Sequence, residues 1–208
     1  MRSNPFATRY TRPGALAFLF PPGQSPETIV AALRQSGWWG QLVGPHGSGK
    51  STLLAALIPE LEKQGRQVVQ VVLGEGQRML SAASGQKAAG RPSPIPDWPL
   101  APESWTDRSQ VVIDGYEQLS WWNRRKVEAL VRRAGSGLLV TTHQTRGLPT
   151  LFQTEPSLQL AQSIVRQLQP PEDSTITPED VAQAWEEQGN NVREVLFRLY
   201  DLYQSRQK

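Results

Sequence analysis

Apolar positions along the chain follow two different spacings. Short unbroken apolar runs are typical of buried strands. Predominantly apolar segments of this length lie at 38–43, 67–73, 110–114 and 137–142, and a shorter candidate lies at 150–154. Stripes with apolar residues three or four positions apart are typical of helices. They lie between the runs, at about 25–36, 50–64 and 120–134. Strands that alternate with helices predict an α/β fold on a five-stranded, mainly parallel sheet with right-handed crossovers.

Local signals refine these elements. Ser25 followed by Pro26 is an N-cap with a proline in the first turn, and Ser120 is a second N-cap. Pro59 falls inside the helix predicted after the first strand and is expected to kink or shorten it.

The segment 74–109 is a long insertion between the second and third strands. We expect a short helix near 77–83 at its start. The run 91–102 that follows is too rich in proline for a helix or a central strand.

The pattern changes after Pro156. From there on, apolar stripes predict three helices, at 157–168, 178–188 and 191–204. We therefore divide the chain into a first domain over 1–156 and a smaller helical subdomain over 157–208.

Composition narrows the classes of site. The chain of 208 residues has no cysteine and two histidines, His46 and His143. Disulfide scaffolds, zinc ribbons, iron–sulfur centres and cysteine nucleophiles are excluded, and a His-rich metal site is disfavoured. A formal charge of +3 allows a nucleic-acid partner without arguing for one. No apolar run is long enough to span a membrane, and we expect a cytoplasmic protein.

The first chemical signal is a glycine-rich turn between the first strand and the next helix. It matches the phosphate-binding loop pattern Gly-x-x-x-x-Gly-Lys-Ser in full: Gly44-Pro45-His46-Gly47-Ser48-Gly49-Lys50-Ser51. Glycines let backbone N–H groups turn toward a phosphate, and the new helix adds its positive N-terminus there. Lys50 is expected to reach the β- and γ-phosphates and Ser51 to offer its hydroxyl to Mg²⁺. The predicted nucleotide-binding residues extend through Thr52.

The second signal is the apolar strand Val111-Val112-Ile113-Asp114, which is the Walker B pattern. Its aspartate would hold Mg²⁺ through the water shell of the ion. The predicted metal site is therefore Ser51 with Asp114, and Lys50 and Asp114 are predicted catalytic residues.

A departure from the usual pattern follows this strand. ATP-hydrolysing proteins commonly place a glutamate directly after the aspartate to orient the attacking water, whereas here the next residue is Gly115. The nearest acid is Glu117. It reaches the water if the turn after Gly115 folds back, and otherwise it is a solvated loop residue. We assign Glu117 as the candidate catalytic acid and leave both interpretations open.

Polar residues end the fourth predicted strand, Leu138-Leu139-Val140-Thr141-Thr142-His143. The carboxyl ends of parallel strands face the ligand, so Thr141 or Thr142 could contact the γ-phosphate or the water. Thr142 is the residue assigned as catalytic, and His143 is a less direct candidate.

The arginines leave several options. Asn190 or Asn191 is expected to cap the last helix, which puts Arg193 in its first turn, either projecting to a nucleotide or lying on a solvated face. Three other arginines are candidates for acting on a neighbour's γ-phosphate, or are simply solvated: Arg132, Arg133 and Arg146.

These residues resemble the P-loop NTPases of the additional-strand class, close to the AAA+ ATPases and their NACHT-type signalling relatives. The resemblance covers about residues 4–204. It implies a three-layer sandwich followed by a small helical lid over 157–208. The family's sensor-2 arginine corresponds to Arg193, its sensor-1 residue to Thr141 or Thr142, and the segment beside the adenine to 4–6. The turn that carries Glu117 resembles the NACHT form.

The sequence departs from this family in two places. Almost no helix separates the last two strands, where the family carries its arginine finger, so Arg146 would have to serve or the finger is absent. The 74–109 insertion has no counterpart, and the motifs do not imply a ring.

The resemblance implies ATP and Mg²⁺ as cofactors, and a slow ATPase that switches shape with a protein partner or by self-association. A small-molecule kinase and a non-hydrolysing nucleotide sensor are the alternatives. A GTPase is excluded because Asn-Lys-x-Asp is missing, and an ABC ATPase because Leu-Ser-Gly-Gly-Gln is missing.

Overall fold

The computed structural model describes residues 4–74, 77–82, 104–170, 172–189 and 191–207. The helices are α1 (Thr8–Thr11), α2 (Pro26–Gln35), α3 (Lys50–Lys63), α4 (Trp121–Arg133), α5 (Leu158–Leu168), α6 (Pro178–Glu187) and α7 (Val192–Arg206). The strands are β1 (Trp39–Val43), β2 (Gln67–Gly74), β3 (Gln77–Ala82), β4 (Ser109–Asp114), β5 (Gly137–Thr142) and β6 (Thr150–Gln153). A 3-10 turn, η2 (Tyr116–Gln118), follows β4. The proline-rich run 91–102 lies outside the described residues.

The strands form one sheet in the order β3-β2-β4-β5-β1-β6. Five of these strands, β2, β4, β5, β1 and β6, run parallel to one another, which confirms the predicted α/β class. β3 is antiparallel to β2, and it replaces the helix that we predicted near 77–83. The N–H and C=O groups of β2 would otherwise be unpaired at this edge, and pairing with β3 satisfies them. Such a long-range pairing is invisible to local periodicity.

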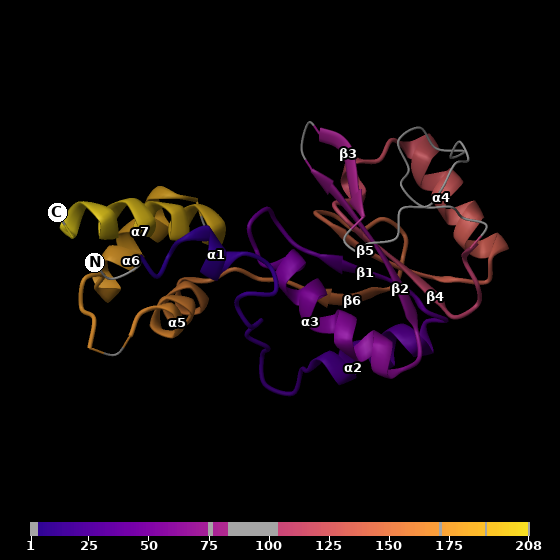
Figure 1. Ribbon diagram of the computed structural model, residues 1–208, viewed down its shortest axis with the longest axis horizontal. Coiled ribbons are helices and arrows are strands. Elements are labelled where there is room, and N and C mark those ends of the chain that lie inside the picture. The colour runs from indigo at the N-terminus through magenta and orange to yellow at the C-terminus, as the bar shows by residue number, and fades with distance from the viewer. Residues whose placement is uncertain (1–3, 75–76, 83–103, 171, 190, 208) are drawn as a thin grey trace.

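Helices cover both faces of the sheet (Figure 1). Along β4, Val112 packs with α2 and α3 on one face. Its neighbours Val111 and Ile113 pack with α4 on the other. This alternation follows from the period of two along a strand. The result is the three-layer arrangement expected from the sequence, with the central strands fully buried.

Pro59 does not shorten its helix, because α3 continues to Lys63. Of the two outcomes that we expected, a kink or a shorter helix, the second is therefore wrong. A proline inside a helix costs about 3 kcal/mol. Leu57 and Leu61 flank it and are fully buried, and each such burial contributes about 1.5–3 kcal/mol. Packing against the sheet therefore offsets the lost backbone hydrogen bond.

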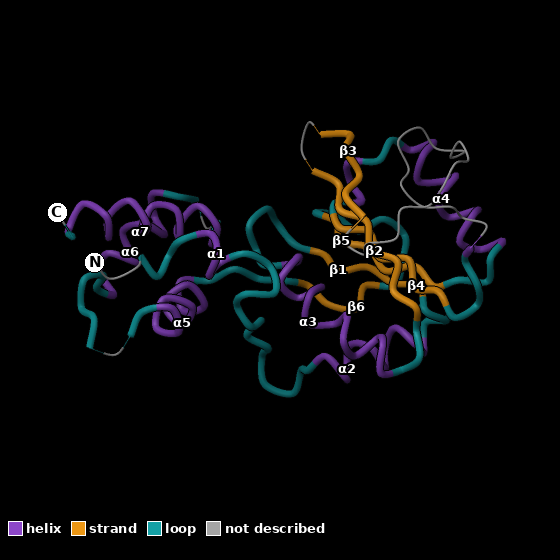
Figure 2. Tube along the Cα trace, viewed as in Figure 1, coloured by secondary structure: helices purple, strands orange, loops and turns teal. Residues whose placement is uncertain are grey.

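The helices α5, α6 and α7 gather at one end of the elongated molecule, and we call them the helical bundle (Figure 2). The bundle has its own buried core. Phe6, from the start of the chain, is 1% exposed within that core and meets Tyr203 edge to face at 6.0 Å between ring centroids. Asn4 donates its side-chain amide to the Tyr200 carbonyl at 3.0 Å. The first described residues thus pack with the last helix.

Candidate functional site

The glycine-rich turn joins β1 to α3 as a phosphate loop. Gly47 and Gly49 have φ values of +67° and +88°, in the left-handed region that favours glycine. Gly49 is the N-cap of α3, so the first turn of that helix opens toward the loop. Backbone N–H groups at a helix N-terminus are suited to an anion.

Lys50 is held inside this loop. Its Nζ donates to the carbonyl oxygens of Gly44 and Pro45, each at 2.7 Å. Burial lowers the pKa of Lys50, while the negative charges of Glu117 and Asp114 act in the opposite direction. Those two carboxylates therefore share an electrostatic environment with the lysine.

The base of the loop is packed tightly against the end of β6. Ser48 Oγ lies 2.6 Å from Thr154 Oγ1, and it also donates to the Pro45 carbonyl at 2.8 Å. A Cβ on Gly44 would lie 1.9 Å from Thr154 Oγ1. Glycine is therefore required at Gly44 by the close approach of Thr154.

The Walker B aspartate meets a threonine from the neighbouring strand. Thr141 Oγ1 donates to Asp114 Oδ1 at 2.6 Å and accepts from the Gly115 N–H at 2.8 Å. Thr142, which we assigned as catalytic, is instead turned away and donates to the Gln144 carbonyl at 2.9 Å. Successive strand residues point to opposite faces, so only Thr141 can accompany Asp114.

Glu117 is carried back to the same place by the turn after β4. Gly115 has a φ of +84°, and the 3-10 turn η2 follows it directly. Glu117 Oε1 lies 3.1 Å from His143 Nε2. Glu117 Oε2 is buried and has no hydrogen-bond partner among the described residues. Of the two interpretations of Glu117, the structure shows the turn folded back, with Glu117 lining the same cavity as Asp114.

These groups line a cavity of about 810 Å³ between the phosphate loop and the helical bundle. The volume lies within the range of small-ligand sites. Of the predicted site residues, those that line it are His46, Gly47, Ser48, Gly49, Lys50, Ser51, Thr52, Asp114, Glu117 and Arg193. Gly44 and Pro45 contribute through the carbonyls that hold Lys50. One cavity therefore brings together predicted site residues that lie between Gly44 and Arg193 in the sequence.

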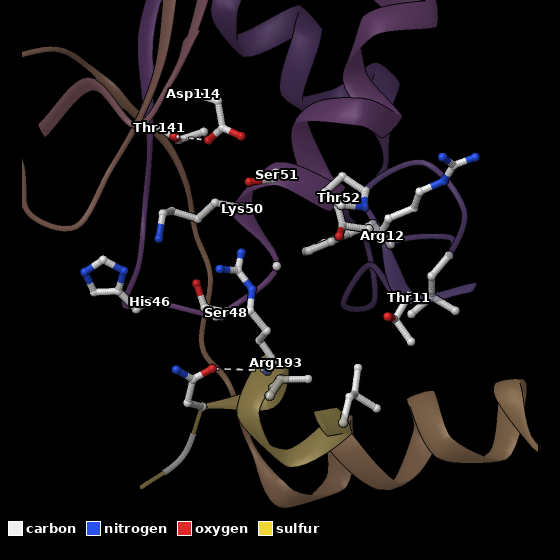
Figure 3. Close-up of a pocket in the computed structure, with 18 of the residues that line it drawn as sticks. Thr11, Arg12, His46, Ser48, Lys50, Ser51, Thr52, Asp114, Thr141 and Arg193 are labelled. Carbon is white, nitrogen blue, oxygen red and sulfur yellow. Dashed lines mark hydrogen bonds between the residues drawn. The ribbon is translucent and has the colours of Figure 1, made fainter. Parts of the chain in front are cut away.

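The helical bundle lines the cavity with residues at the start of α7. Asn191 caps that helix and accepts from the N–H groups of Arg193 and Glu194. From the first turn, Arg193 extends toward the phosphate loop (Figure 3). A Cβ on Gly47 would lie 1.7 Å from Asn191 Oδ1, so the cap touches the loop itself.

Sequence reasoning missed one wall of the cavity. This wall comes from the segment after α1, with Arg12, Leu16 and Phe18, and from apolar bundle residues such as Phe197. These residues have no motif, and apolar spacing alone does not distinguish a cavity wall from a core. We expected 4–6 beside a nucleotide base, whereas Phe6 is buried in the bundle core.

His143 is also brought into the cavity, where its ring centroid lies 3.5 Å from that of His46. His46 sits in the phosphate loop and His143 directly after β5. The close approach of the two rings links the phosphate loop to the acid Glu117 through His143.

The cavity fits a magnesium ion bound together with phosphates. The Ser51 hydroxyl and the Asp114 carboxylate both line it (Figure 3). Among the described residues, no group of three or more His, Cys, Asp or Glu side chains is arranged so that it could hold a metal ion. Mg²⁺ commonly uses one or two protein ligands with substrate phosphates and water, so this sparse set suits it.

The candidate arginine fingers lie elsewhere. Arg132 and Arg146 line a second hollow behind the Glu117 turn, and Arg133 lies near the end of α4. None of the three lines the main cavity. A role for them in a neighbouring molecule stays a prediction.

No protein-family model matches the chain, and no curated protein matches it in sequence. Among solved structures, the crystal structure of a DNA replication initiation factor superposes with a TM-score of 0.47 at 13% sequence identity. The superposition covers 88% of this chain and 64% of that one, so this chain spans less than two thirds of that protein's length. Among the described residues, no helix is long and apolar enough to cross a membrane. The chain therefore has an α/β fold in which a glycine-rich loop joins β1 to α3 at the carboxyl end of a parallel strand.

Proposed function

We propose that the chain binds ATP with Mg²⁺ in the cavity beside the phosphate loop and hydrolyses it slowly. The observation that carries the proposal is the position of Glu117. Its Oε2 is buried without a hydrogen-bond partner in the described structure, in the same cavity as Lys50 and Asp114. A buried acceptor costs free energy when it is unpaired, and an attacking water would satisfy it.

Each group has a distinct role in this proposal. The loop N–H groups and Lys50 hold the phosphates, with Lys50 leaving its two carbonyl partners for the β- and γ-phosphates. Mg²⁺ would neutralise charge on those phosphates beside Ser51 and Asp114. Glu117 orients a water toward the γ-phosphate, which is a positioning task typical of phosphoryl transfer.

The helical bundle makes the site responsive to the nucleotide. Arg193 adds a positive charge from α7, and Asn191 touches Gly47 of the loop. Loss of the γ-phosphate would remove the anion that Arg193 faces, so the bundle would move relative to the sheet. This is the nucleotide-driven switch that the sequence suggested, with the bundle as its lid and 1–156 as the nucleotide-binding domain.

The test compares ATP binding and turnover in two variants. Glu117→Gln should keep ATP affinity and lose about 100-fold or more in turnover, because a positioned general base typically contributes that much. Lys50→Ala should weaken ATP binding by about tenfold or more, the usual worth of a charged hydrogen bond. Isothermal titration and a phosphate-release assay supply the two readouts.

The controls are matched in chemistry. Glu62→Gln and Lys63→Ala alter exposed residues near the far end of α3 and should change neither readout. ATP affinity that is unchanged in Lys50→Ala would refute the proposal. Binding that needs Lys50 with no turnover at any protein concentration would instead identify a non-hydrolysing sensor.

A kinase has less support. Of the acids that could serve as its base, Asp97 and Glu103 lie outside the described residues, and Asp107 is not among the residues that line the cavity. The cytoplasmic location and the partner remain predictions.

A further inference from the structure

The outer face of α4 presents two large aromatic side chains to solvent. Trp121 is 57% and Trp122 71% exposed, and the rings meet edge to face at 4.6 Å between centroids. Two adjacent indoles left in water forgo the stabilisation that burial of such large apolar surfaces provides. Tryptophan and arginine are also the residues that dominate protein interfaces, so the pair marks a contact surface.

A hollow of about 500 Å³ lies beside Trp121. Of the residues that the structure describes, four arginines line it, Arg124, Arg125, Arg132 and Arg146, and one acid, Glu128. The Arg146 guanidinium has no hydrogen bond or ion pair within the described part of the chain, and Arg132 lies over the Trp39 ring at 4.3 Å. The hollow therefore has an excess of positive charge that an anionic group would complement.

The back of this hollow is the turn that carries Glu117. Arg124 Nη2 donates to the Glu117 carbonyl at 2.8 Å, and its Nε donates to the Tyr116 carbonyl at 3.3 Å. The Tyr116 hydroxyl donates to Glu128 at 2.9 Å. Tyr116, Arg124 and Glu128 all line the hollow, so a ligand there contacts the groups that position η2.

We propose that an acidic protein segment with an apolar anchor docks on Trp121, Trp122 and the arginine hollow, and that its binding changes ATP turnover through Arg124. The carboxylates would pair with the guanidinium groups, which bind carboxylates bidentately. The apolar anchor would cover the indoles. The second clause rests on the proposed function, whereas the first does not.

Two features favour a protein over a nucleic acid. Glu128 in the wall of the hollow repels phosphate, and Tyr116 and Arg125 hold it there. The two indoles lie edge to face and not as a flat platform on which successive bases stack.

The test uses fluorescence anisotropy with a short labelled peptide in which glutamate alternates with leucine and phenylalanine. Two other probes are run beside it, the same peptide with glutamine for glutamate, and oligothymidylate of similar length. Trp122→Ala and Arg125→Glu should each weaken peptide binding about tenfold or more, as interface hot spots do. Arg34→Glu makes the same charge change on an exposed position of α2 and should leave binding unchanged.

The coupling is tested with Arg124→Lys, which keeps the charge but loses the fork that holds two carbonyls. The peptide should still bind this variant, and it should change the turnover of the wild type about twofold or more but not that of the variant. Basal turnover of Trp122→Ala should equal that of the wild type.

Four outcomes would overturn the proposal. The first is no peptide binding at millimolar concentration, and the second is equal binding by Trp122→Ala and Arg125→Glu. Oligothymidylate bound in place of the peptide would assign the surface to nucleic acid. Peptide binding that leaves the ATP turnover of the wild type unchanged would refute the proposed coupling through Arg124. Peptide anisotropy needs no nucleotide, so it stays readable if ATP binding itself fails.

Discussion

At the scale of single residues, Thr141 is the group that organises the Walker B strand. Its hydroxyl donates to Asp114 and accepts from the Gly115 N–H, so it fixes both the acid and the start of the turn. Thr142, one residue on, is buried on the opposite face, and among the described groups its hydroxyl bonds only the Gln144 carbonyl. Two adjacent threonines thus have different hydrogen-bond partners because strand side chains alternate.

This difference predicts opposite outcomes for two matched substitutions. Thr141→Val should lower ATP turnover about tenfold or more, because Asp114 loses a donor and the Gly115 N–H loses its acceptor. Thr142→Val should leave turnover within about twofold of the wild type. Phosphate release at saturating ATP measures both. Equal losses in the two variants would contradict the role given to Thr141.

At the scale of elements, the turn after β4 decides where the acid lies. Gly115 takes a φ of +84°, and a Cβ there would lie 2.5 Å from the Leu73 carbonyl oxygen. The backbone of β2 therefore restricts this position to glycine. The return of the chain at Gly115 is what places Glu117 in the cavity.

Gly115→Ala is predicted to lose turnover and stability together. A side chain in the left-handed region costs about 1–2 kcal/mol, and the collision with backbone adds to it. Gly135→Ala is the matched control, since its φ is +68° but the nearest atom to a Cβ is 3.7 Å away. We expect Gly135→Ala to lose only the conformational part and to keep turnover. Denaturant-induced unfolding measures the stability of the two variants, and phosphate release measures their turnover. Similar turnover in Gly115→Ala and Gly135→Ala would refute the prediction.

The bundle elements are held by an ion pair that makes their stability depend on pH. Arg206 near the end of α7 donates to Asp180 at the start of α6, at 2.8 Å between Nη2 and Oδ1. This hydrogen bond, with help from Thr177, lowers the pKa of Asp180. A carboxyl with a lowered folded-state pKa adds stability above its unfolded pKa and loses it as the pH falls through the folded value.

Asp180→Asn should therefore melt below the wild type at neutral pH, with a difference that shrinks below about pH 4. Melting temperatures of both proteins from neutral to acidic pH measure this. A difference that stays constant with pH would show that the ion pair contributes no linkage.

At the scale of the whole molecule, the bundle contacts the phosphate loop and the segment that begins the described chain. Asn191 touches Gly47 of the phosphate loop, and the first described residues run from the bundle core toward the cavity wall. The ligand cavity lies between these contacts. If the proposed function holds, nucleotide state and bundle position would be linked through these contacts.

Phe6→Ala should destabilise the bundle by about 3–5 kcal/mol, the usual cost of removing a buried phenylalanine. Tyr10→Ala changes a 40% exposed aromatic nearby and should have little effect. Hydrogen exchange, which reports local opening, should show faster exchange in α5–α7 of Phe6→Ala and unchanged exchange in the sheet. Uniform loss of protection over the chain would contradict a separate role for this core.

The sequence alone was enough for features that depend on neighbouring residues. Five of the strands, the helix caps at Ser25 and Ser120 and the glycine-rich loop occur where local patterns predicted them. Backbone preferences and side-chain periodicity act over a few residues, and so they can be read directly from the chain.

The tertiary structure decided what depends on distant residues. Pairing with β2 made 77–82 a strand, and burial of Leu57 and Leu61 kept α3 intact across Pro59. That Thr141 and not Thr142 contacts Asp114 depends on how β5 pairs with β4. That Glu117 lies in the cavity depends on how the turn after β4 packs against its neighbours. These outcomes are set by contacts between positions far apart in sequence, where packing and hydrogen bonding outweigh local preference by a few kcal/mol.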